Sequence, residues 1–550
     1  MSSDPEIAIT TSSVPALLDE AAARFPHHVA IDFFGRKLTY AELARRVDRV
    51  ARGFQNIGVE RGTRVGLCLP NSPYFIIAYY AVLKAGGVIV NFNPLYVARE
   101  IAQQIENSGT TIMVTLDVAK IYPTIAEVLE TSSLKKVVVC SLRAALPPLK
   151  GLLFGFFKAK ELARIPRDER HIPFARLLAD HTPPARVAIN PAIDLAVLQY
   201  TGGTTGVPKG AMLSHANLTA NVAQIRDRVP VLRPGQERAL VLLPLFHVFG
   251  MTTCMNFCIS LGAELVLLPS FDLAQVLEFI IKKKPTLFPG VPSLFATVSH
   301  KAEHEKFDLS SIRYCISGGA SLPLETRQRF EALTGCKLVE GYGLTEAAPV
   351  VAANALDAPY KNESVGPPLK GLTVEIRSLD DPTKILRTGE RGEICLRGPN
   401  IMAGYWRNLE ETKAVFIDGA LRTGDVGYLD KDGDLFLVDR IKDIIICNGF
   451  KIYPRMIEEA LLQHPAVAEA VAIGVADPVR GQVPKAFVTL LPGTAATPAD
   501  LLDFLRTHLS RLELPRAIEI RATLPKTNIG KISRKDLVVE ETRNSASASA

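Results

Sequence analysis

Residues 200–210, with the sequence YTGGTTGVPKG, combine the residue types that hold phosphate. Glycines let a backbone approach an anion closely, threonine hydroxyls donate hydrogen bonds, and a lysine neutralises negative charge. The segment does not fit the P-loop pattern, because Lys209 follows Pro208 and precedes Gly210 instead of Ser or Thr. The sequence therefore predicts a phosphate site of another kind, and a plain strand-to-helix turn is the alternative.

Four further segments are rich in glycine and polar residues: ISGGASLP (316–323), EGYGLTE (340–346), RTGDVGYLD (422–430) and LPKTNIGKISRKDL (524–537). Singly they are typical of turns or of a solvated basic surface. In this order, together with residues 200–210, they resemble the motif series of the adenylate-forming enzymes, which include acyl-CoA ligases, luciferases and adenylation domains of peptide synthetases. The resemblance extends from about residue 10 to about residue 538. Within the superfamily, LQYTGGTTGVPKGAMLSH, LPLFHVFG, EGYGLTEAAP and NPLY look most like bacterial long-chain fatty acid–CoA ligases.

The resemblance implies that the loop 201–210 covers the β- and γ-phosphates of ATP. The donors that it implies there are Thr201, Thr204, Thr205 and Lys209. Gly202 stands where many relatives carry serine, so one hydroxyl donor is missing. The whole set that the resemblance assigns to ATP is Thr201, Gly202, Gly203, Thr204, Thr205, Gly206, Lys209, Gly318, Gly319, Ala320, Gly341, Tyr342, Gly343, Asp425 and Arg440.

The nucleoside end of this set has a stated role for each residue. Tyr342 would lie against the adenine, and residues 318–320 would leave room for the base. Asp425 would accept hydrogen bonds from both ribose hydroxyls, since an ionised carboxylate is acceptor-only. Arg440 would approach the ribose or a phosphate. The alternative for Asp425 is an ordinary turn residue.

Catalytic roles fall, by the same resemblance, on Thr345, Glu346, His247 and Lys531. Glu346 would hold Mg²⁺, which takes few carboxylates plus phosphate oxygens, and Thr345 would contact the α-phosphate. His247 would lie on the acyl side of the pocket. The alternatives are a helix first-turn residue for Glu346 and a core histidine for His247. Lys531 would stabilise the negative charge that develops on the transferring oxygens; by itself it would be a surface lysine.

Lys531 lies far along the chain from the phosphate loop, so the resemblance also implies a movement. A small domain would carry Lys531 over ATP for the first step and swing away about Lys442 for the second, and a hinge needs few residues. Gly449, Phe450 and Lys451 would then face the site and admit the pantetheine arm of CoA. A β-turn at Asn448-Gly449 is the alternative for this segment.

The elements that must position these residues follow from apolar patterning. Runs such as RVGLCLP, TTIMVTL, KKVVVC and LAVLQY alternate with helical patterns from about residue 28 to about residue 380. Strands with few polar positions indicate mostly parallel sheets covered by helices. Shorter alternating strands from about residue 372 indicate a small β-barrel-like part, and an α+β unit follows, which the resemblance implies is mobile. We expect an α/β protein with a large AMP-binding domain (1–439), a small α+β domain (440–540) and a disordered tail (541–550).

Composition narrows the class of protein. The 550 residues are 47% hydrophobic and 22% charged, with a net charge of +6 and no dense Lys/Arg run, so nucleic acid is not an expected partner. Eight dispersed cysteines without a C-x-x-C pair and a start without a signal peptide favour a reduced, cytoplasmic protein.

Residues 239–263 lack charge, but proline, histidine and glycine interrupt them, which favours a buried core over a membrane span. Residues 149–167 mix Leu and Phe with Lys and Arg, a composition typical of contact with the inner membrane surface, although a packed helix is the commoner explanation.

The resemblance implies an ATP-dependent fatty acid–CoA ligase that uses ATP, Mg²⁺ and CoA and passes through an acyl-adenylate. One alternative is a ligase of the same superfamily for aryl or other acids, or one that transfers to a carrier protein; the chain stops soon after Lys531, which leaves no room for a carrier domain. The other alternative is a non-catalytic nucleotide-binding regulatory protein. The presence of Lys531 and Glu346 argues against it, since binding alone needs neither.

Overall fold

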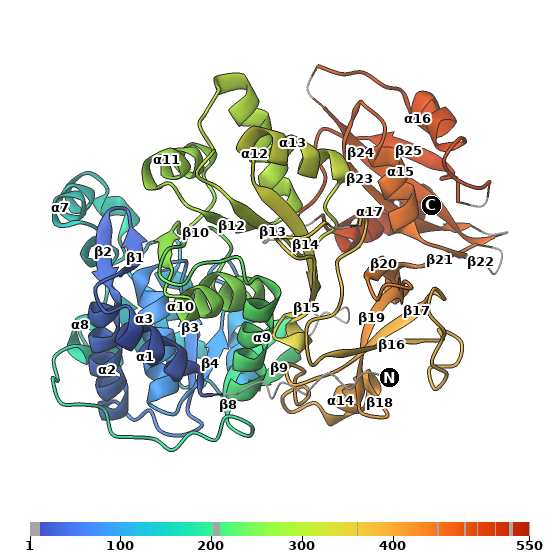
Figure 1. Ribbon diagram of the computed structural model, residues 1–550. Coiled ribbons are helices and arrows are strands. Elements are labelled where there is room, and N and C mark those ends of the chain that lie inside the picture. The colour runs from blue at the N-terminus through green and yellow to red at the C-terminus, as the bar shows by residue number, and fades with distance from the viewer. Residues whose placement is uncertain are drawn as a thin grey trace.

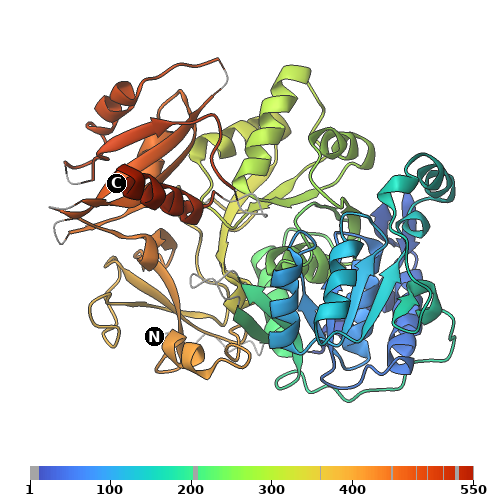
Figure 2. The same cartoon turned by 180° about the vertical axis from the view of Figure 1, so that it is seen from behind.

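The structure, a computed structural model, describes residues 12–201, 209–359, 361–447, 450–477, 480–491, 493–511, 513–526 and 532–548, without the side chains of 304 and 544–548. Two large sheets form the N-terminal part, and two smaller sheets follow along the chain (Figure 1). The view from behind shows the C-terminal sheet next to both the N-terminal part and the small antiparallel sheet (Figure 2).

The first large sheet has eight strands, parallel except at its two ends. In spatial order they are β15 (Val350–Ala353), β14 (Lys337–Gly343), β13 (Tyr314–Ser317), β12 (Leu287–Gly290), β10 (Arg238–Val241), β11 (Glu264–Leu267), β1 (Val29–Phe33) and β2 (Arg36–Thr39). The residues of its central strands are buried in succession, because helices cover both faces and leave no polar side. The carboxyl ends of β13 and β14 carry the segments SGGA and YGLTE.

The second large sheet has seven strands, and β9 pairs antiparallel with β8 at one edge. In spatial order they are β7 (His171–Pro173), β6 (Lys136–Cys140), β5 (Ile112–Leu116), β3 (Arg64–Cys68), β4 (Val88–Asn91), β8 (Leu195–Thr201) and β9 (Lys209–Ser214). The apolar runs therefore form the predicted parallel strands. The predicted α/β fold with mostly parallel sheets is confirmed.

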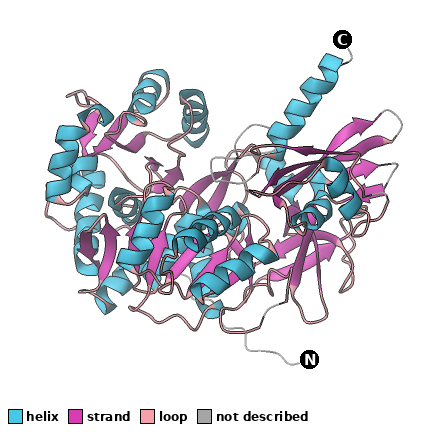
Figure 3. Ribbon diagram, turned by 90° about the horizontal axis from the view of Figure 1, so that it is seen from above, coloured by secondary structure: helices cyan, strands magenta, loops and turns pink. Residues whose placement is uncertain are grey.

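The helices of the N-terminal part lie between and over these sheets (Figures 1 and 3). They are α1 (Val14–Arg24), α2 (Tyr40–Asn56), α3 (Pro73–Lys84), α4 (Ala98–Ser108), α5 (Tyr122–Thr131), α6 (Leu142–Ala145), α7 (Pro148–Phe157), η1 (Ala159–Glu161), α8 (Phe174–Leu177), α9 (His215–Arg228), η2 (Gly250–Asn256), α10 (Phe257–Ser260), α11 (Leu273–Lys283), α12 (Pro292–Glu305), α13 (Leu324–Thr334) and η3 (Thr345–Ala347). The uncharged segment 239–263 forms β10, η2 and α10, all buried. Within the described ranges, no helix has both the length and the apolar character to cross a bilayer.

The small antiparallel sheet follows β15. It contains β16 (Thr373–Arg377), β17 (Gly392–Arg397), β18 (Phe416–Ile417), β19 (Ala420–Leu429) and β20 (Leu435–Arg440), with α14 (Leu409–Val415) before β18. Its longest strand, β19, pairs with β17 and β20. These are the shorter alternating strands that the sequence predicts from about residue 372.

The C-terminal sheet carries its own hydrophobic cluster. Its elements are η4 (Ile441–Asp443), β21 (Ile445–Cys447), β22 (Phe450–Ile452), α15 (Pro454–Leu462), β23 (Val467–Asp477), β24 (Gly481–Leu490), α16 (Pro498–Leu505), β25 (Ala517–Ile520) and α17 (Arg534–Ala548). The last helix extends away from the body (Figure 3) and includes most of residues 541–550, where the sequence predicts disorder. All eight cysteines are buried and free of disulfide bonds.

Candidate active site

The phosphate loop connects two paired strands. Thr201 ends β8 and Lys209 begins β9, and the two residues lie opposite each other in the antiparallel pair. The loop between them, with Gly202, Gly203, Thr204, Thr205 and Gly206, lies outside the described residues. The structure therefore fixes both ends of the segment that the sequence assigns to the phosphates.

Lys209 is the described cation of this loop. Its ammonium Nζ lies 2.6 Å from Glu411 Oε2 and 5.5 Å from the centre of the Tyr405 ring. The lysine side chain is only 15% exposed, so these two contacts fix its direction. Sequence reasoning missed both partners, because Glu411 is 202 residues away along the chain and Tyr405 sits in an ordinary loop sequence, GYW.

Glu346 lies in η3, directly after β14. Its carboxylate Oε1 accepts a hydrogen bond of 2.7 Å from the Tyr405 hydroxyl, and its carbonyl accepts one of 2.8 Å from the Met402 amide. Thr345 begins the same short helix. Tyr405 thus contacts both Lys209 and Glu346, and so brings together two residues that the sequence assigns to the phosphates and to Mg²⁺.

The residues around Glu346 suit magnesium in number and kind. Mg²⁺ is usually held by one or two carboxylates together with substrate phosphates and water, not by a protein cage. Among the described residues there is no group of three or more His, Cys, Asp or Glu side chains that could form such a cage. Glu346, with Glu411 as a second carboxylate near Lys209, therefore offers the number and kind of ligands that this ion takes.

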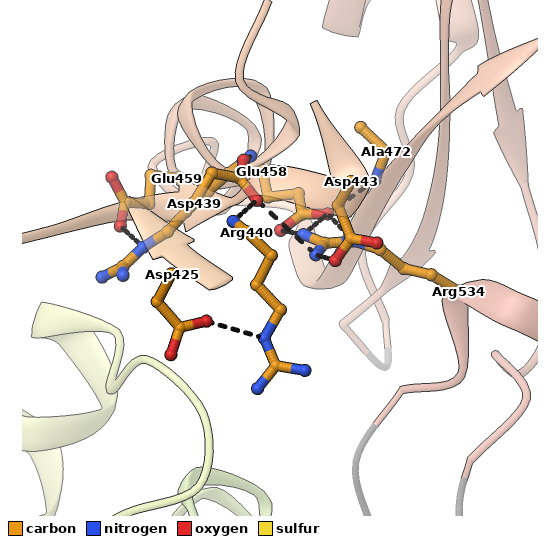
Figure 4. A network of polar contacts seen from close by, with 9 residues as sticks. Asp425, Asp439, Arg440, Asp443, Glu458, Glu459, Ala472 and Arg534 are labelled. Carbon is orange, nitrogen blue, oxygen red and sulfur yellow. Dashed lines mark hydrogen bonds and ion pairs between the residues drawn. The ribbon is translucent and has the colours of Figure 1, made fainter. Parts of the chain in front are cut away.

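Three residues that the sequence assigns to the nucleoside lie where β14, β19 and β20 approach one another. The Tyr342 hydroxyl donates a 2.6 Å hydrogen bond to Asp425 Oδ2, and Arg440 Nε lies 3.2 Å from Asp425 Oδ1. Figure 4 shows the Arg440 side chain extending toward Asp425. Burial, and secondarily the neighbouring Asp425 charge, raises the pKa of Tyr342, so its hydroxyl stays a donor. The structure brings together three of the residues that the sequence assigns to the nucleoside.

The glycines beside Tyr342 are required by space. A Cβ on Gly343 would lie 2.2 Å from the Pro349 carbonyl oxygen, and one on Gly318 would lie 3.0 Å from the Phe249 ring. Gly319 has a φ of +83°, a region that favours glycine. Ala320 follows in the same turn, and Gly341 lies in β14. Ligands of parallel sheets bind outside the carboxyl ends of the strands, which is where this turn lies.

His247 precedes the π-helix η2. Its Nδ1 accepts a 3.2 Å hydrogen bond from the Phe249 amide, and its own amide donates to the Pro244 carbonyl at 3.1 Å. The His247 side chain is half-buried. Its role on the acyl side stays a prediction, as does the alternative of a core histidine.

The junction with the C-terminal sheet is strongly charged. The Arg534 guanidinium lies 2.9 Å from Asp443 and 2.6 Å from Glu458 (Figure 4). Lys442 directly precedes Asp443 in η4, and burial followed by the nearby Arg440 charge lowers its pKa. The hinge role of Lys442 at this link between two sheets stays a prediction.

Of the residues predicted to admit CoA, the structure describes Phe450 and Lys451. Phe450 is 58% exposed, and Lys451 Nζ pairs with Asp380 Oδ1 at 2.8 Å, next to the small antiparallel sheet. Gly449 and Lys531 lie outside the described residues.

One buried acid connects the N-terminal part to α15. Glu340 in β14 is 4% exposed and lies 3.9 Å from Arg327. Burial raises the pKa of Glu340 to about 7, although the charges of Arg455 and Arg327 oppose the shift. Glu340 is thus a titrating group between the two parts of the chain.

Glu340→Gln should change how stability depends on pH. Between the ordinary carboxyl pKa of 4.5 and about 7, the unfolded chain has lost this proton and the folded chain keeps it. The free energy of unfolding therefore falls as pH rises through this window, by an amount on the order of 3 kcal/mol for this group. Urea unfolding at pH 5 and pH 7.5 should show a smaller difference for the variant than for the wild type. Equal pH dependence of the two proteins would show that Glu340 does not titrate there.

Comparison with known proteins places the chain in a family. Residues 18–406 match the AMP-binding enzyme family, and residues 456–531 match the AMP-binding enzyme C-terminal domain. The chain belongs to the AMP-binding enzyme family. It is 41% identical over 550 residues to the long-chain-fatty-acid–CoA ligase of Bacillus subtilis (strain 168), covering 98% of this chain and 96% of that protein. The predicted boundary at 439/440 falls between the two matches and stays a prediction.

Two solved structures are similar over nearly their whole length. ATP-bound MatB from Rhodopseudomonas palustris is 28% identical with a TM-score of 0.82, covering 96% of this chain and 99% of that one. The anthranilate CoA ligase AuaEII, in complex with anthranoyl-AMP, is 25% identical with a TM-score of 0.85, covering 98% of each chain.

Proposed function

We propose that this protein is an ATP-dependent ligase that converts a long-chain fatty acid into its CoA thioester through an acyl-adenylate. The observation that carries the proposal is that Tyr405 contacts both Lys209 and Glu346. Tyr342, which shortly precedes Glu346 along the chain, pairs with Asp425. Such an arrangement offers a cation and a metal ligand at one end and a ribose acceptor at the other. The 41% sequence identity to the long-chain-fatty-acid–CoA ligase of Bacillus subtilis supports a long-chain fatty acid as the substrate.

The reaction needs two displacements. A carboxylate oxygen of the fatty acid forms a bond to the α-phosphorus of ATP, and the bond to pyrophosphate breaks. The CoA sulfur then bonds to the acyl carbon, its proton is lost to solvent, and the bond to AMP breaks. Forming the mixed anhydride replaces one difficult step by two easier ones, because AMP leaves far more readily than oxide.

Each protein group has a part in the first displacement. Lys209 and the loop before it would hold the β- and γ-phosphates, and Thr345 the α-phosphate. Glu346 would ligate Mg²⁺, which when bound supplies positive charge beside the phosphates. Asp425 would hold the ribose, and Lys531 would stabilise the charge that develops at the α-phosphorus. Lys442 would serve as the hinge that exchanges Lys531 for residues 449–451 between the steps.

Pyrophosphate release across a panel of acids tests the substrate. We expect long-chain acids such as oleate to be turned over with the highest kcat/KM, with CoA required for AMP release. Preference for an aryl acid would favour the alternative of an aryl-acid ligase. The similarity to an anthranilate CoA ligase is the reason to include aryl acids in the panel. ATP binding without pyrophosphate release for any acid would favour a regulatory protein.

We further propose that α7 contacts an anionic membrane surface, which is where long-chain acids collect. Five large apolar side chains of α7 are exposed although they share one face at i, i+3, i+4, i+7, i+8 spacing, a pattern that normally faces a core: Leu149 at 69%, Leu152 at 64%, Leu153 at 46%, Phe156 at 81% and Phe157 at 76%. Exposed Lys158, Lys160, Arg164 and Arg167 follow. The helix lies at the outer edge of the N-terminal part (Figures 1 and 2). An exposed apolar face beside basic residues suits an interfacial helix.

Replacing Leu152, Phe156 and Phe157 together by serine should release the protein from vesicles containing phosphatidylglycerol. Burying these side chains in the bilayer would contribute several kcal/mol, at about 25 cal/mol per Å², so we expect co-sedimentation to fall about tenfold or more. The matched control replaces Leu95, Ile193 and Leu409, which are equally exposed but lie elsewhere. If both triple variants pellet like the wild type, α7 has no such role.

A further inference from the structure

The segment 402–406 joins the two nucleotide-binding elements. At one end the Met402 amide donates to the Glu346 carbonyl at 2.8 Å. At the other end the Trp406 amide donates to the Gly210 carbonyl at 2.8 Å, next to Lys209. The segment therefore holds η3 and the start of β9 at a fixed separation, and Tyr405 lies in it.

The Tyr405 side chain makes one contact to each element. Its ring lies under the Lys209 ammonium, 5.5 Å from the ring centre, and its hydroxyl donates to Glu346 Oε1 at 2.7 Å. The residue is 8% exposed, and its amide donates to Thr412 Oγ1 at 2.9 Å, which fixes the backbone. A rigid ring of two torsions thus sets the distance between a cation and a carboxylate.

The contact of Lys209 with the Tyr405 ring can persist when a phosphate binds the ammonium, whereas its ion pair with Glu411 cannot. Glu411 Oε2 lies 2.6 Å from the ammonium, and a phosphate that takes the ammonium would replace this carboxylate. A cation over an aromatic face keeps that interaction while its other side binds an anion. Tyr405 can therefore aim Lys209 both before and after a nucleotide arrives.

The hydroxyl contact restrains the second group. When a carboxylate binds Mg²⁺ through one oxygen, a hydrogen bond to its other oxygen fixes its orientation. Groups that hydrogen-bond to metal ligands generally have this function. The Tyr405 hydroxyl donates to Glu346 Oε1 at 2.7 Å and so occupies this second oxygen.

We propose that Tyr405 is a positioning residue that aims Lys209 at the phosphates through its ring and Glu346 at Mg²⁺ through its hydroxyl. This inference rests on the proposed use of Mg·ATP. The two functions reside in different atoms of one side chain, so two substitutions separate them. Tyr405→Phe removes the hydroxyl and keeps the ring, and Tyr405→Ala removes both.

The test is binding of an ATP analogue with a methylene bridge between the α- and β-phosphates, which cannot form an adenylate. Calorimetric titration is carried out on the full chain with Mg²⁺ and with EDTA. With Mg²⁺, Tyr405→Phe should bind the analogue about tenfold more weakly and need more Mg²⁺ for half-saturation, because a hydrogen bond to a charged group is lost. With EDTA it should bind like the wild type. Tyr405→Ala should bind more weakly under both conditions.

Two further variants complete the test. Tyr122→Phe removes another buried tyrosine hydroxyl, which pairs at 2.8 Å with His171 in β7, at the opposite edge of the sheet from β9, and it should bind as the wild type does. Glu346→Gln combined with Tyr405→Phe should show no further loss of Mg²⁺ dependence beyond Glu346→Gln alone. An equal loss with Mg²⁺ and with EDTA for Tyr405→Phe, or none, would overturn the inference. Wild-type protein that binds the analogue equally well without Mg²⁺ would instead count against the proposed function.

Discussion

Replacing Lys531 by alanine should slow acyl-adenylate formation about a hundred- to thousandfold, the usual cost of losing one preorganised charge at a transition state. Thioester formation from supplied acyl-adenylate should stay largely intact, because the small domain would by then have carried Lys531 away from the nucleotide. The two half-reactions can be measured separately, by pyrophosphate release in single turnover and by CoA consumption with synthetic oleoyl-AMP.

The matched control is Lys526→Ala. Lys526 lies five residues earlier, and its ammonium pairs with Glu469 at 2.6 Å on the C-terminal sheet. This variant should keep both half-reactions within a factor of about two, since exposed ion pairs contribute little. If Lys531→Ala slowed both half-reactions equally, Lys531 would contribute to a feature shared by the two steps, and its assigned role would be wrong.

Asp425→Asn should lower kcat/KM for ATP about a hundredfold, because the charge that would accept from the ribose hydroxyls is lost. Asparagine keeps the shape and one oxygen for the Tyr342 hydroxyl, which now lies 2.6 Å from Asp425 Oδ2. The effect therefore reports the charge rather than a collapse of the pocket.

The substrate 2′-deoxy-ATP sharpens this prediction. Wild-type enzyme should use it about tenfold less well than ATP, whereas Asp425→Asn should discriminate far less, since a contact already weakened cannot be lost again. Asp432→Asn is the control: Asp432 is 56% exposed and pairs with Lys361. Undiminished discrimination in Asp425→Asn would place the ribose elsewhere.

The parallel sheets could be predicted from sequence because their strands are buried on both faces. Runs such as KVVVC contain almost nothing else than apolar residues, and this one forms β6. The motif segments likewise locate Lys209, Glu346, Tyr342 and Asp425, since the resemblance rests on their order along the chain. The contacts of these residues confirm that they lie in two adjoining groups.

Contacts between distant segments could not be predicted. Tyr405 and Glu411 reach Lys209 across about 200 residues, and nothing in GYW or NLEET distinguishes them from surface residues. The exposure of the apolar face of α7 could not be predicted either. Its apolar spacing is typical of a buried face, and only the fold shows that these side chains are exposed. The helix α17 extends to Ala548, and the predicted disordered tail at 541–550 stays a prediction.

The central claim has two parts. A carboxylate oxygen attacks the α-phosphorus of ATP, and the bond between that oxygen and the acyl carbon breaks in the second step. Turnover of oleate labelled with ¹⁸O in both carboxyl oxygens, followed by mass spectrometry of the nucleotide product, tests this directly. The account predicts AMP that carries one ¹⁸O atom. Unlabelled AMP, or label in inorganic phosphate with ADP as the nucleotide product, would contradict it.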